Sequence, residues 1–333
     1  MGPRRVRPHA QLGDRRQRSR RRRMTYRTAS ETEASDYVER IHRAVVTGVR
    51  QLGPGMIRVT LGGDDLHDYP TTGIGDEYVR LFFPDEAHLE PHLPFVSGRG
   101  WDYEEGVEPS QMRTYTIRDH RPGEIDIDFV IHEGGIASTW VLGAKPGYVL
   151  GINPPRDLYA LPEGVTKQVL ICDEPALPAA LRVAELTPDV ETEIVCEIRD
   201  AGYELFPSVG LKAANWVRGS GNGHRPSRLV ETVKRLDIPN DGSVYVWVAG
   251  ETRVTREVRS HLRHTLGLPG SAYKVVGYWT YEVEAWTAKW EALDESIKQQ
   301  IMDLYGETEN GEPEMDEEAR IDEVFRIYAS VGL

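Results

Sequence analysis

The sequence predicts a two-domain chain of the β plus α/β class, in which an antiparallel β-barrel precedes a parallel-sheet α/β domain. Three observations predict it. The chain has 333 residues, enough for two domains of about 100–200 residues each. Short segments rich in Val, Ile, Tyr and Phe crowd the first half, and strand-like and helix-like segments alternate in the second. We therefore expect a disordered Arg-rich segment over 1–35, the barrel over 36–160, the α/β domain over 161–280 and a helical extension over 281–333.

Six segments of the first half are expected to be barrel strands, because β-branched and aromatic residues favour strands and Gly- or Pro-containing turns separate them. They are Ala44–Val49, Met56–Leu61, Tyr78–Phe83, Arg113–Ile117, Ile125–Ile131 and Tyr148–Ile152. Short strands with no long helical pattern between most of them are typical of a small antiparallel barrel. The polar stretch Pro84–Ser110 is expected to be a long loop or flap.

The second half alternates strands and helices, which implies crossover connections and a parallel sheet covered on both faces. The expected strands are Gln168–Cys172, Glu193–Ile198, Ala213–Val217, Val244–Ala249 and Tyr273–Gly277. The expected helices are Ala176–Leu186, a helix capped by Ser227 and ending near Leu236, and Arg253–Leu266.

The C-terminal extension begins with an apolar stripe on one helix, in which Trp286, Trp290, Leu293, Ile297, Ile301 and Leu304 recur every three or four residues. An acidic linker and a last short helix around Phe325 follow. We expect Trp286 and Trp290 to pack against the α/β domain rather than form a ligand cage.

Charge is distributed unevenly along the chain. The net charge is −13, yet residues 1–23 contain ten Arg and one Asp. An Arg-rich head can bind nucleic acid or act as an address, but we expect translated leader or a disordered tail ahead of a true start at Met24. The acidic remainder argues against nucleic acid as the partner of the folded part.

Two cysteines, Cys172 and Cys196, cannot supply the thiolates of an ordinary iron–sulfur cluster or a Cys-rich zinc site. They form no disulfide framework either, so the cytoplasm is the expected location. The ten His residues lack metal-ligand spacing, so no metal site is assigned. Apolar runs fall far short of the roughly 20 residues of a membrane span, so no membrane association is expected.

Two segments of the barrel half could bind a phosphate group. In Arg113-Thr114-Tyr115-Thr116, the period of a strand places Arg113 and Tyr115 on one face, where a cation and a ring could hold a pyrophosphate and stack on a flat ring. In the stretch His132–Trp140, two glycines precede a helix that starts with small residues. Its free amides suit a diphosphate, although an ordinary turn capped by Ser138 is an equal alternative.

Two further segments lie at strand ends of the α/β half. Val246–Thr252 ends in small residues where a doubly wound sheet opens its crevice, and Arg253 and Arg256 follow in the first helical turn, where a bound phosphate would offset the helix dipole. Asp173–Ala179 marks another strand-to-helix junction, at which the acids either contact ribose hydroxyls or cap the helix.

One motif is set aside. Gly219–His224 resembles a dinucleotide fingerprint, but its sixth position is His224 and no acid closes a strand about 20 residues later. We expect a flexible loop there. The signatures of zinc proteases, phosphate-loop NTPases and α/β-hydrolases do not occur.

Taken together and in order, these segments resemble the siderophore-interacting protein family, flavin reductases of ferric siderophores. The resemblance covers about residues 38–280. It rests on Arg113–Thr116, His132 with Gly135–Trp140, Pro146-Gly147, Asn153–Arg156, Asp173–Ala179, Trp247–Glu251 and Gly277–Trp279. The chain departs from the family pattern at Ile136, Asn153, Arg156, Pro175 and Thr280.

The resemblance implies a ferredoxin-reductase-like architecture with an FAD-binding barrel and an NAD(P)H-binding α/β domain. Arg113, Tyr115 and Thr116 would hold the flavin and its phosphates, and the turn of His132, Gly135, Ala137, Ser138 and Thr139 would line the diphosphate. Asp173 would reach ribose, and Ala249, Gly250 and Glu251 would border the nicotinamide nucleotide. No catalytic side chain is assigned.

The implied activity is transfer of electrons from NADPH or NADH through FAD to the Fe(III) of a ferric siderophore, with reduced ferredoxin as another possible donor. Arg80 and Arg156 are the expected contacts to an anionic siderophore, followed by Lys274. Two alternatives remain open. One is a general flavin reductase or electron-transfer flavoprotein, and the other is a siderophore-binding protein without reductase activity.

Overall fold

The computed structural model describes residues 39–85, 89–97, 100–132, 134–205, 213–305 and 317–332. From Arg40 onward the chain forms one compact unit. The predicted Arg-rich segment over 1–35 and nearly all of the acidic linker lie outside the described residues.

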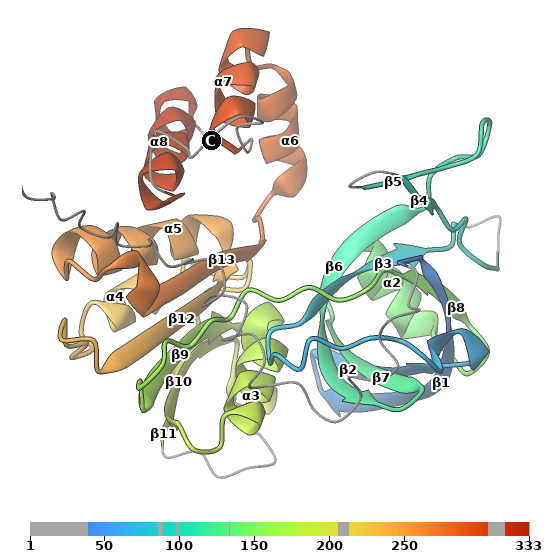
Figure 1. Ribbon diagram of the computed structural model, residues 1–333, viewed down its shortest axis with the longest axis horizontal. Helices are drawn as coiled ribbons and strands as arrows, with labels where there is room; N and C mark the ends of the chain where they lie inside the picture. The colour runs from blue at the N-terminus through green and yellow to red at the C-terminus, as the bar shows by residue number, and fades with distance from the viewer. Residues whose placement is uncertain are drawn as a thin grey trace, which may run out of the picture. The chain divides into compact units, whose positions relative to one another are not determined.

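The first half is a closed six-stranded barrel, as predicted (Figure 1). Its neighbours pair antiparallel in the order β1-β2-β7-β6-β3-β8. The barrel is filled by alternate residues of these strands, such as Val59, Leu81, Ile117 and Ile127, which are completely buried. The strands are β1 His42–Gly53, β2 Met56–Gly62, β3 Tyr78–Phe83, β6 Gln111–Arg121, β7 Glu124–Val130 and β8 Val149–Ile152.

The predicted loop Pro84–Ser110 contains a small hairpin, so that prediction was incomplete. Strands β4 (Phe95–Ser97) and β5 (Gly100–Asp102) pair antiparallel. Trp101 on β5 lies edge-on against the ring of Phe82, with 5.4 Å between centroids. Three-residue strands carry too little alternation to be recognised from sequence, and the hairpin is fixed instead by this aromatic contact with β3.

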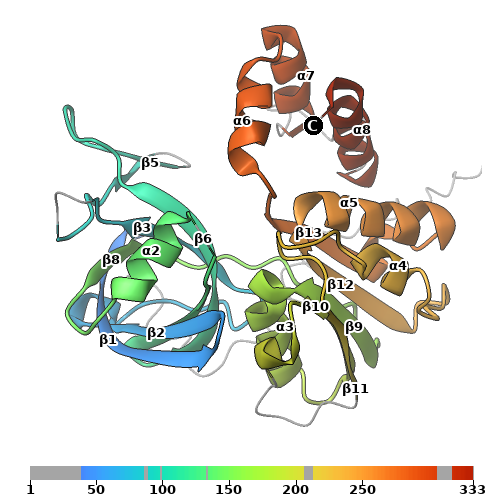
Figure 2. The same ribbon diagram turned by 180° about the vertical axis from the view of Figure 1, so that it is seen from behind.

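One helix belongs to the barrel. Helix α2, Ile136–Gly143, connects β7 to β8 and lies beside β7 and β3 (Figure 2). Its Trp140 packs on Phe83 and Phe129, with ring centroids 5.7 and 5.8 Å away. This contact fixes the start of α2 close to the strand that carries Tyr115, whose ring lies 4.4 Å from Phe129.

The second half is a five-stranded, fully parallel sheet in the order β11-β10-β9-β12-β13, as predicted. Helix α3 (Leu177–Leu186) covers one face, and α4 (Leu229–Val233) and α5 (Thr252–Ser260) cover the other (Figure 1). From β9 the chain continues to β10 on one side, whereas β12 and β13 lie on the other side of β9. The position between β9 and β12 is therefore the switch point at which such sheets bind ligands. The strands are β9 Lys167–Asp173, β10 Glu191–Ile198, β11 Ala213–Arg218, β12 Val244–Glu251 and β13 Tyr273–Trp279.

Two helices of this half differ from prediction at their ends. The helix expected over Arg253–Leu266 is α-helical only to Ser260 and continues as a π turn over His261–Thr265. The helix expected to begin at Ser227 is the short α4, with Arg228 at its cap position. The Ser227 hydroxyl does accept the Leu229 N–H, but it also donates to Glu197 and so belongs to the preceding loop. Short single-turn elements are η1 Asp64–Leu66, η2 Glu174–Ala176, η3 Ala201–Tyr203 and η5 Gly270–Ala272.

The C-terminal extension consists of α6 (Val283–Glu291), α7 (Glu295–Tyr305) and α8 (Glu317–Val331). The predicted single stripe is therefore split over two helices, because the Asp294 carboxylate accepts the Ser296 N–H and starts α7. Trp286 and Trp290 stack on each other at 5.8 Å.

The tryptophan pair packs within the extension, against Tyr328 of α8, with ring centroids 6.3 and 6.4 Å apart. The expected packing on the α/β domain was thus wrong. The extension is instead joined to α5 by arginines. Arg259 forms an ion pair with Glu318 at 2.5 Å, and the Arg256 guanidinium lies 4.7 Å from the ring of Tyr328 and 5.0 Å from that of Phe325.

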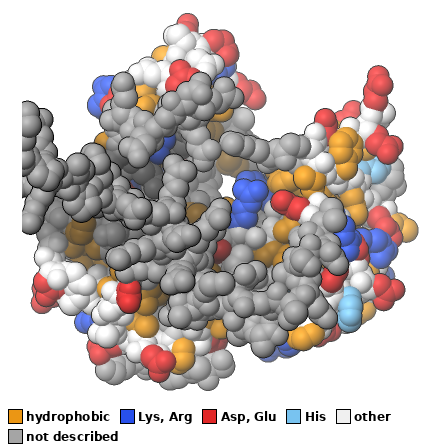
Figure 3. All heavy atoms as spheres, in the orientation of Figure 1, with side chains coloured by type: hydrophobic (Ala, Val, Ile, Leu, Met, Phe, Trp, Pro, Cys, Tyr) orange, Lys and Arg blue, Asp and Glu red, His pale blue; other side chains and the backbone are white. Residues whose placement is uncertain are grey.

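Among the described residues, no helix combines the length and the apolar character that crossing a bilayer requires. On the face seen in Figure 3, acidic side chains are spread over the described surface rather than collected in one patch. On this face, the acidic surplus of the chain marks no single site.

Candidate functional site

Strand β6 presents a guanidinium with no carboxylate partner among the described residues. Arg113 is exposed, and its Nη1 donates only to the carbonyl of Met112, at 2.7 Å. Tyr115, two residues later, packs against the barrel core through its contact with Phe129. Burial raises the pKa of Tyr115, so its hydroxyl stays protonated. Thr116 points to the opposite side of the strand and is buried. An open cation and a ring therefore share one face, as the strand period predicted.

The turn before α2 leaves backbone donors available. Gly134 adopts the left-handed conformation, with φ of 78°, which favours glycine. The first helical bond runs from the Thr139 N–H to the Gly135 carbonyl, at 2.9 Å. No side chain caps the helix and its first turn carries no acid. The amides of the first turn thus retain their capacity for an anion.

The side chains of this turn have structural contacts. Ser138 accepts the His132 N–H at 3.1 Å and donates to the Val130 carbonyl at 3.4 Å, which joins the strand end to the helix. Ala137 is buried, while Thr139 and His132 are exposed. The buried Trp140 Nε1 has no hydrogen-bond partner. Backbone amides, together with this indole N–H, are consequently the free donors here.

Asp173 joins three turns at the carboxyl edge of the sheet. Its carboxylate accepts the Trp279 indole N–H at 2.7 Å, the Glu251 amide at 2.8 Å and the Ala176 amide at 3.4 Å. Burial raises its pKa to about 7. Asp173 is 3% exposed. Its bond from the Ala176 amide is the capping contact, and its other two bonds connect the ends of β12 and β13 to this turn.

The end of β12 is organised around the same carboxylate. A Cβ on Gly250 would lie 2.7 Å from Asp173 Oδ2, so only glycine fits. Glu251 caps α5, accepting the amides of Arg253 and Val254 at 2.7 and 3.0 Å through Oε2. Ala249 is completely buried against the α3 side of the sheet. Ala249 and Gly250 thus leave little side-chain bulk at the end of β12, and Glu251 fixes the turn into α5.

Tyr278 lies where the barrel meets the sheet. Its hydroxyl hydrogen-bonds with Thr116 of β6, and burial raises its pKa. Its ring contacts Trp247 edge-on at 6.2 Å, and the Trp247 indole donates to Asp76 at 3.3 Å. The sequence motifs contain Tyr278, but the fold alone shows that it brings β13 to the Arg113–Thr116 strand.

Buried ion pairs fix the barrel to α3. Arg182 of α3 pairs with Glu77 at 2.6 Å and donates to the Ile117 carbonyl at 2.8 Å. Arg118 of β6 binds Glu185 through two bonds of 2.6 and 2.7 Å. Sequence reasoning missed these residues, because each partner lies more than 60 positions away.

The three predicted substrate contacts are placed differently. Arg80 of β3 lies with its guanidinium 6.0 Å from the Trp101 ring, and its backbone amide donates to Asn153 at 2.6 Å. The exposed Arg156 pairs through its backbone with Tyr78, at the start of the same strand. Lys274 lies near the amino end of β13, opposite Trp247. The fold thus brings Arg80 and Arg156 together along β3 and leaves Lys274 apart.

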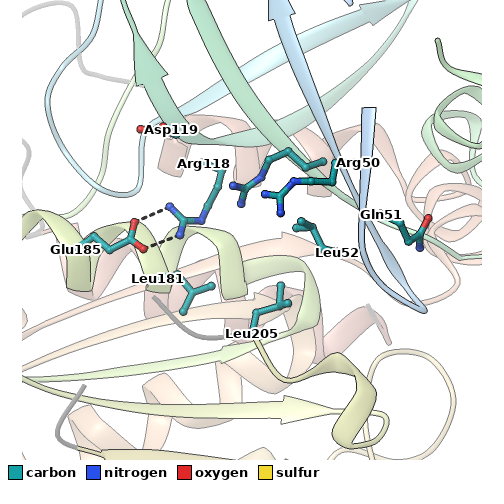
Figure 4. A pocket seen from close by; sticks show the side chains of 9 residues that line it. Arg50, Gln51, Leu52, Arg118, Asp119, Leu181, Glu185 and Leu205 are labelled. Carbon is teal, nitrogen blue, oxygen red and sulfur yellow. Dashed lines mark hydrogen bonds and ion pairs between the residues drawn. The ribbon is translucent and has the colours of Figure 1, made fainter. Parts of the chain in front are cut away.

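A hollow of about 470 Å³ lies elsewhere, between barrel strands and α3 (Figure 4). Arg50 of β1, the Arg118–Glu185 pair and Leu181 are among its lining residues. None of the site residues predicted from the sequence lines it. We therefore look for the chemistry at the β6, α2 and sheet-edge residues, which the sequence motifs select and which include Arg113 and the uncapped first turn of α2.

Comparisons with known proteins point to one family. Residues 45–158 match the siderophore-interacting FAD-binding domain, and residues 165–282 match the siderophore-interacting protein family. The NADPH-dependent ferric-chelate reductase of Escherichia coli (strain K12) is 30% identical over 225 residues, or 66% of this chain and 85% of that protein. Ferric vibriobactin reductase ViuB of Vibrio cholerae serotype O1 is 28% identical over 257 residues, 74% of this chain and 92% of that protein.

Solved structures agree. A siderophore utilization protein from T. fusca superposes with a TM-score of 0.64 at 29% identity, covering 74% of this chain and 95% of that one. A ferredoxin NADP⁺ reductase from Neisseria gonorrhoeae, at 11% identity and a TM-score of 0.52 over 72% of this chain and 99% of that one, shows the shared fold alone. With both halves matched in order, the chain belongs to the siderophore-interacting protein family.

Proposed function

We propose that the protein is an oxidoreductase, an FAD-dependent reductase that passes electrons from NAD(P)H to the Fe(III) of ferric siderophores and releases Fe(II). The observation that carries this is the pairing of an open cation, Arg113, with the uncapped first turn of α2. Phe129 connects the two, because its ring contacts both Tyr115, two residues after Arg113, and Trp140 of α2. The relatives named above support the electron donor and the acceptor.

The described residues fit an FAD on three counts. Arg113 and the α2 amides supply positive groups for a diphosphate. Gly134 and Gly135 keep side chains away from that turn. The unpartnered Trp140 Nε1 is a further donor. A bound flavin would supply the conversion between two-electron donation by a nicotinamide and one-electron acceptance by Fe(III).

The chain's own residues position the two reaction partners. Asp173 and Glu251 fix the carboxyl end of β12, where the small residues Ala249 and Gly250 leave room for a flat nicotinamide ring. Tyr278 and Thr116 bring that edge to β6. Arg80 and Arg156 give the β3 side a positive charge, which raises the local concentration of an anionic ferric chelate. Lys274 would contribute only to a larger substrate that reaches along β13.

The proposal extends to the location of the protein and to its electron donor. Cys172 and Cys196 are free and buried, in keeping with a reducing compartment, and we place the protein in the cytoplasm. NADPH is the preferred donor in this proposal. NADH and reduced ferredoxin are the alternatives to be compared in the same assay.

The test is anaerobic turnover of the purified protein with added FAD, in the presence of a ferrous chelator. We expect Fe(II) to be trapped from ferric catecholate and ferric hydroxamate siderophores when NADPH is supplied. Faster turnover on free flavin or a dye than on both ferric complexes would favour a general flavin reductase. Affinity for the ferric complexes without trapped Fe(II) would favour a binding protein. Failure to take up FAD would overturn the proposal.

A further inference from the structure

The hollow of Figure 4 is bordered by a row of charged residues that crosses four neighbouring strands of the barrel. Arg50 of β1 lies directly opposite Arg58 of β2, and Arg58 lies directly opposite Asp128 of β7. Arg118 of β6 follows, at the point where the register between β6 and β7 shifts. Paired residues of adjacent strands project from the same face of a sheet. The row therefore gathers three arginines and one aspartate on the outer face of the barrel.

Two of these three arginines have carboxylate partners. Arg58 binds Asp128 through two hydrogen bonds of 2.6 and 2.8 Å. Arg118 binds Glu185 of α3 through two bonds of 2.6 and 2.7 Å. Arg50 is exposed and has no hydrogen-bond or ion-pair partner among the described residues. One guanidinium in the row is therefore available to a ligand.

The position of Arg50 is electrostatically unfavourable by itself. Like charges at directly opposite positions of adjacent strands destabilise a sheet, and Arg50 faces Arg58 in this way. The Asp128 carboxylate is buried and is already bound to Arg58, so it does not compensate Arg50. An anion beside Arg50 would offset this repulsion.

Arg118 supplies a second available donor. Both terminal nitrogens of its guanidinium bind Glu185, whereas its buried Nε–H has no hydrogen-bond partner. The nearest carboxylate oxygen, Asp128 Oδ2, is 4.0 Å from this nitrogen, and the Arg118 side chain is only 10% exposed. In Figure 4 this nitrogen lies on the side of the guanidinium that is turned away from Glu185 and toward Arg50. A buried N–H without an acceptor is unfavourable, and an acceptor from a ligand would satisfy it.

The remainder of the hollow is apolar. Leu52 of β1, Leu181 of α3 and Leu205 after η3 line it, and in the view of Figure 4 they lie below the arginines. The volume of about 470 Å³ is within the range of about 300–1,000 Å³ that is usual for small-molecule pockets. The hollow therefore suits a molecule with one charged end and an apolar body rather than an inorganic ion.

The acids around the hollow limit the charge of that molecule. Asp119 and Glu185 also line the hollow. Asp119 binds Arg121 at 2.5 Å, so neither acid is an open partner for Arg50. A second negative charge, as on a phosphate monoester, would lie close to these carboxylates and be repelled by them. A carboxylate carries one charge, and its two oxygens match the fork of N–H donors on arginine.

We propose that this hollow is a binding site for a small organic monocarboxylate. The carboxylate lies between the Arg50 guanidinium and the Arg118 Nε–H, and the apolar body lies over Leu52, Leu181 and Leu205. Because the lining residues come from the barrel and from α3, the ligand stabilises the contact between the two halves of the chain. The site shares no residue with the proposed flavin and nicotinamide contacts, so it does not depend on the proposed function.

The test compares 4-phenylbutanoate with 4-phenylbutanamide, a neutral molecule of nearly the same size. Both are titrated calorimetrically into the purified full-length protein at neutral pH. We expect the acid to bind at least about tenfold more tightly than the amide, because charge-assisted hydrogen bonds are stronger than neutral ones. Arg50→Gln should abolish this preference and leave the affinity for the amide within about twofold of the parent value.

Thermal denaturation separates loss of the site from loss of the fold. Arg50→Gln removes the like charge opposite Arg58, so without ligand it should melt at a temperature no lower than that of the parent protein. Saturating 4-phenylbutanoate should raise the melting temperature of the parent protein but not that of the variant. The matched control is Arg235→Gln, which removes an exposed arginine that pairs with Glu231 after α4. It should behave like the parent protein in both measurements.

Several results would overturn the inference. The parent protein might bind neither probe, or bind the acid and the amide equally, and Arg50→Gln might keep the preference of the parent. Acetate binding as tightly as 4-phenylbutanoate would contradict the role of the three leucines. Phenyl phosphate binding more tightly than 4-phenylbutanoate would contradict the assignment of a monocarboxylate.

Discussion

The barrel and the edge of the parallel sheet use their polar residues in opposite ways. On the barrel, the Arg113 guanidinium has no carboxylate partner among the described residues, and no side chain caps the first turn of α2. At the sheet edge, Asp173, Glu197 and Glu251 each accept three or more hydrogen bonds from neighbouring turns. One region keeps its donors open, and the other uses its acids for its own architecture.

This difference indicates that a polar residue within a family motif can serve the fold rather than contact a ligand. The acids at the sheet edge are buried and satisfied, as buried carboxylates must be to remain tolerable. We therefore expect them to act on a nucleotide only by fixing the turns around it. The open cations are the groups that can gain bonds on binding, so replacing them should change affinity, whereas replacing the buried acids should change stability.

The largest effect is expected at the barrel. Replacing Arg113 with alanine should weaken FAD binding about 100-fold, because a charge-assisted bond to a phosphate contributes about 1.5–3 kcal/mol. The measurement is a titration of the apoprotein with FAD, followed by flavin fluorescence. Arg50→Ala, which removes an exposed arginine from the hollow of Figure 4, is the control and should leave FAD affinity unchanged. Equal losses in both variants would contradict the assignment.

The next effect concerns the pH dependence of stability. Burial raises the pKa of Asp173 to about 7, whereas an unfolded carboxyl loses its proton near pH 4, by the usual reference of about 3.9. The folded chain therefore holds an extra proton between these values, and this group's contribution to stability falls as pH rises through that window.

Asp173→Asn removes that contribution. We compare the free energy of unfolding of the variant with that of the parent protein at each pH. The difference should shift in favour of the variant by about 2 kcal/mol as the pH rises from about 5 to about 8. Denaturant unfolding at the two pH values measures this difference, and Asp237→Asn, at an exposed position, should show none. A difference independent of pH would mean that Asp173 is ionised throughout.

The smallest effect separates a cap from a nucleotide contact. Glu251→Ala should lower stability by about 1 kcal/mol, the usual loss for a helix N-cap, and leave the affinity for NADPH within about twofold. Glu257→Ala, at an exposed position on the same helix, should change neither quantity. A tenfold loss of NADPH affinity without loss of stability would show that Glu251 touches the nucleotide.

Much of the architecture could be predicted from the sequence, because it depends on local signals. The six barrel strands follow from β-branched and aromatic segments between turns, and the parallel sheet follows from alternating strands and helices. The placement of Arg113 and Tyr115 on one face follows from the strand period alone. The hairpin β4–β5, the division of the tryptophan stripe at Asp294 and the π turn after Ser260 depend on contacts or single bonds that leave no such pattern.

The sequence by itself determined the fold class, the order of the motifs and the family, because periodicity and turn chemistry are written in neighbouring residues. Only the tertiary structure decided what each charged side chain does. Asp173 and Glu197 are buried and hydrogen-bonded, Arg256 lies against the rings of α8, and Arg113 is exposed. The physical reason is that the environment of a charge is set by residues distant in sequence, here brought together at the ends of parallel strands.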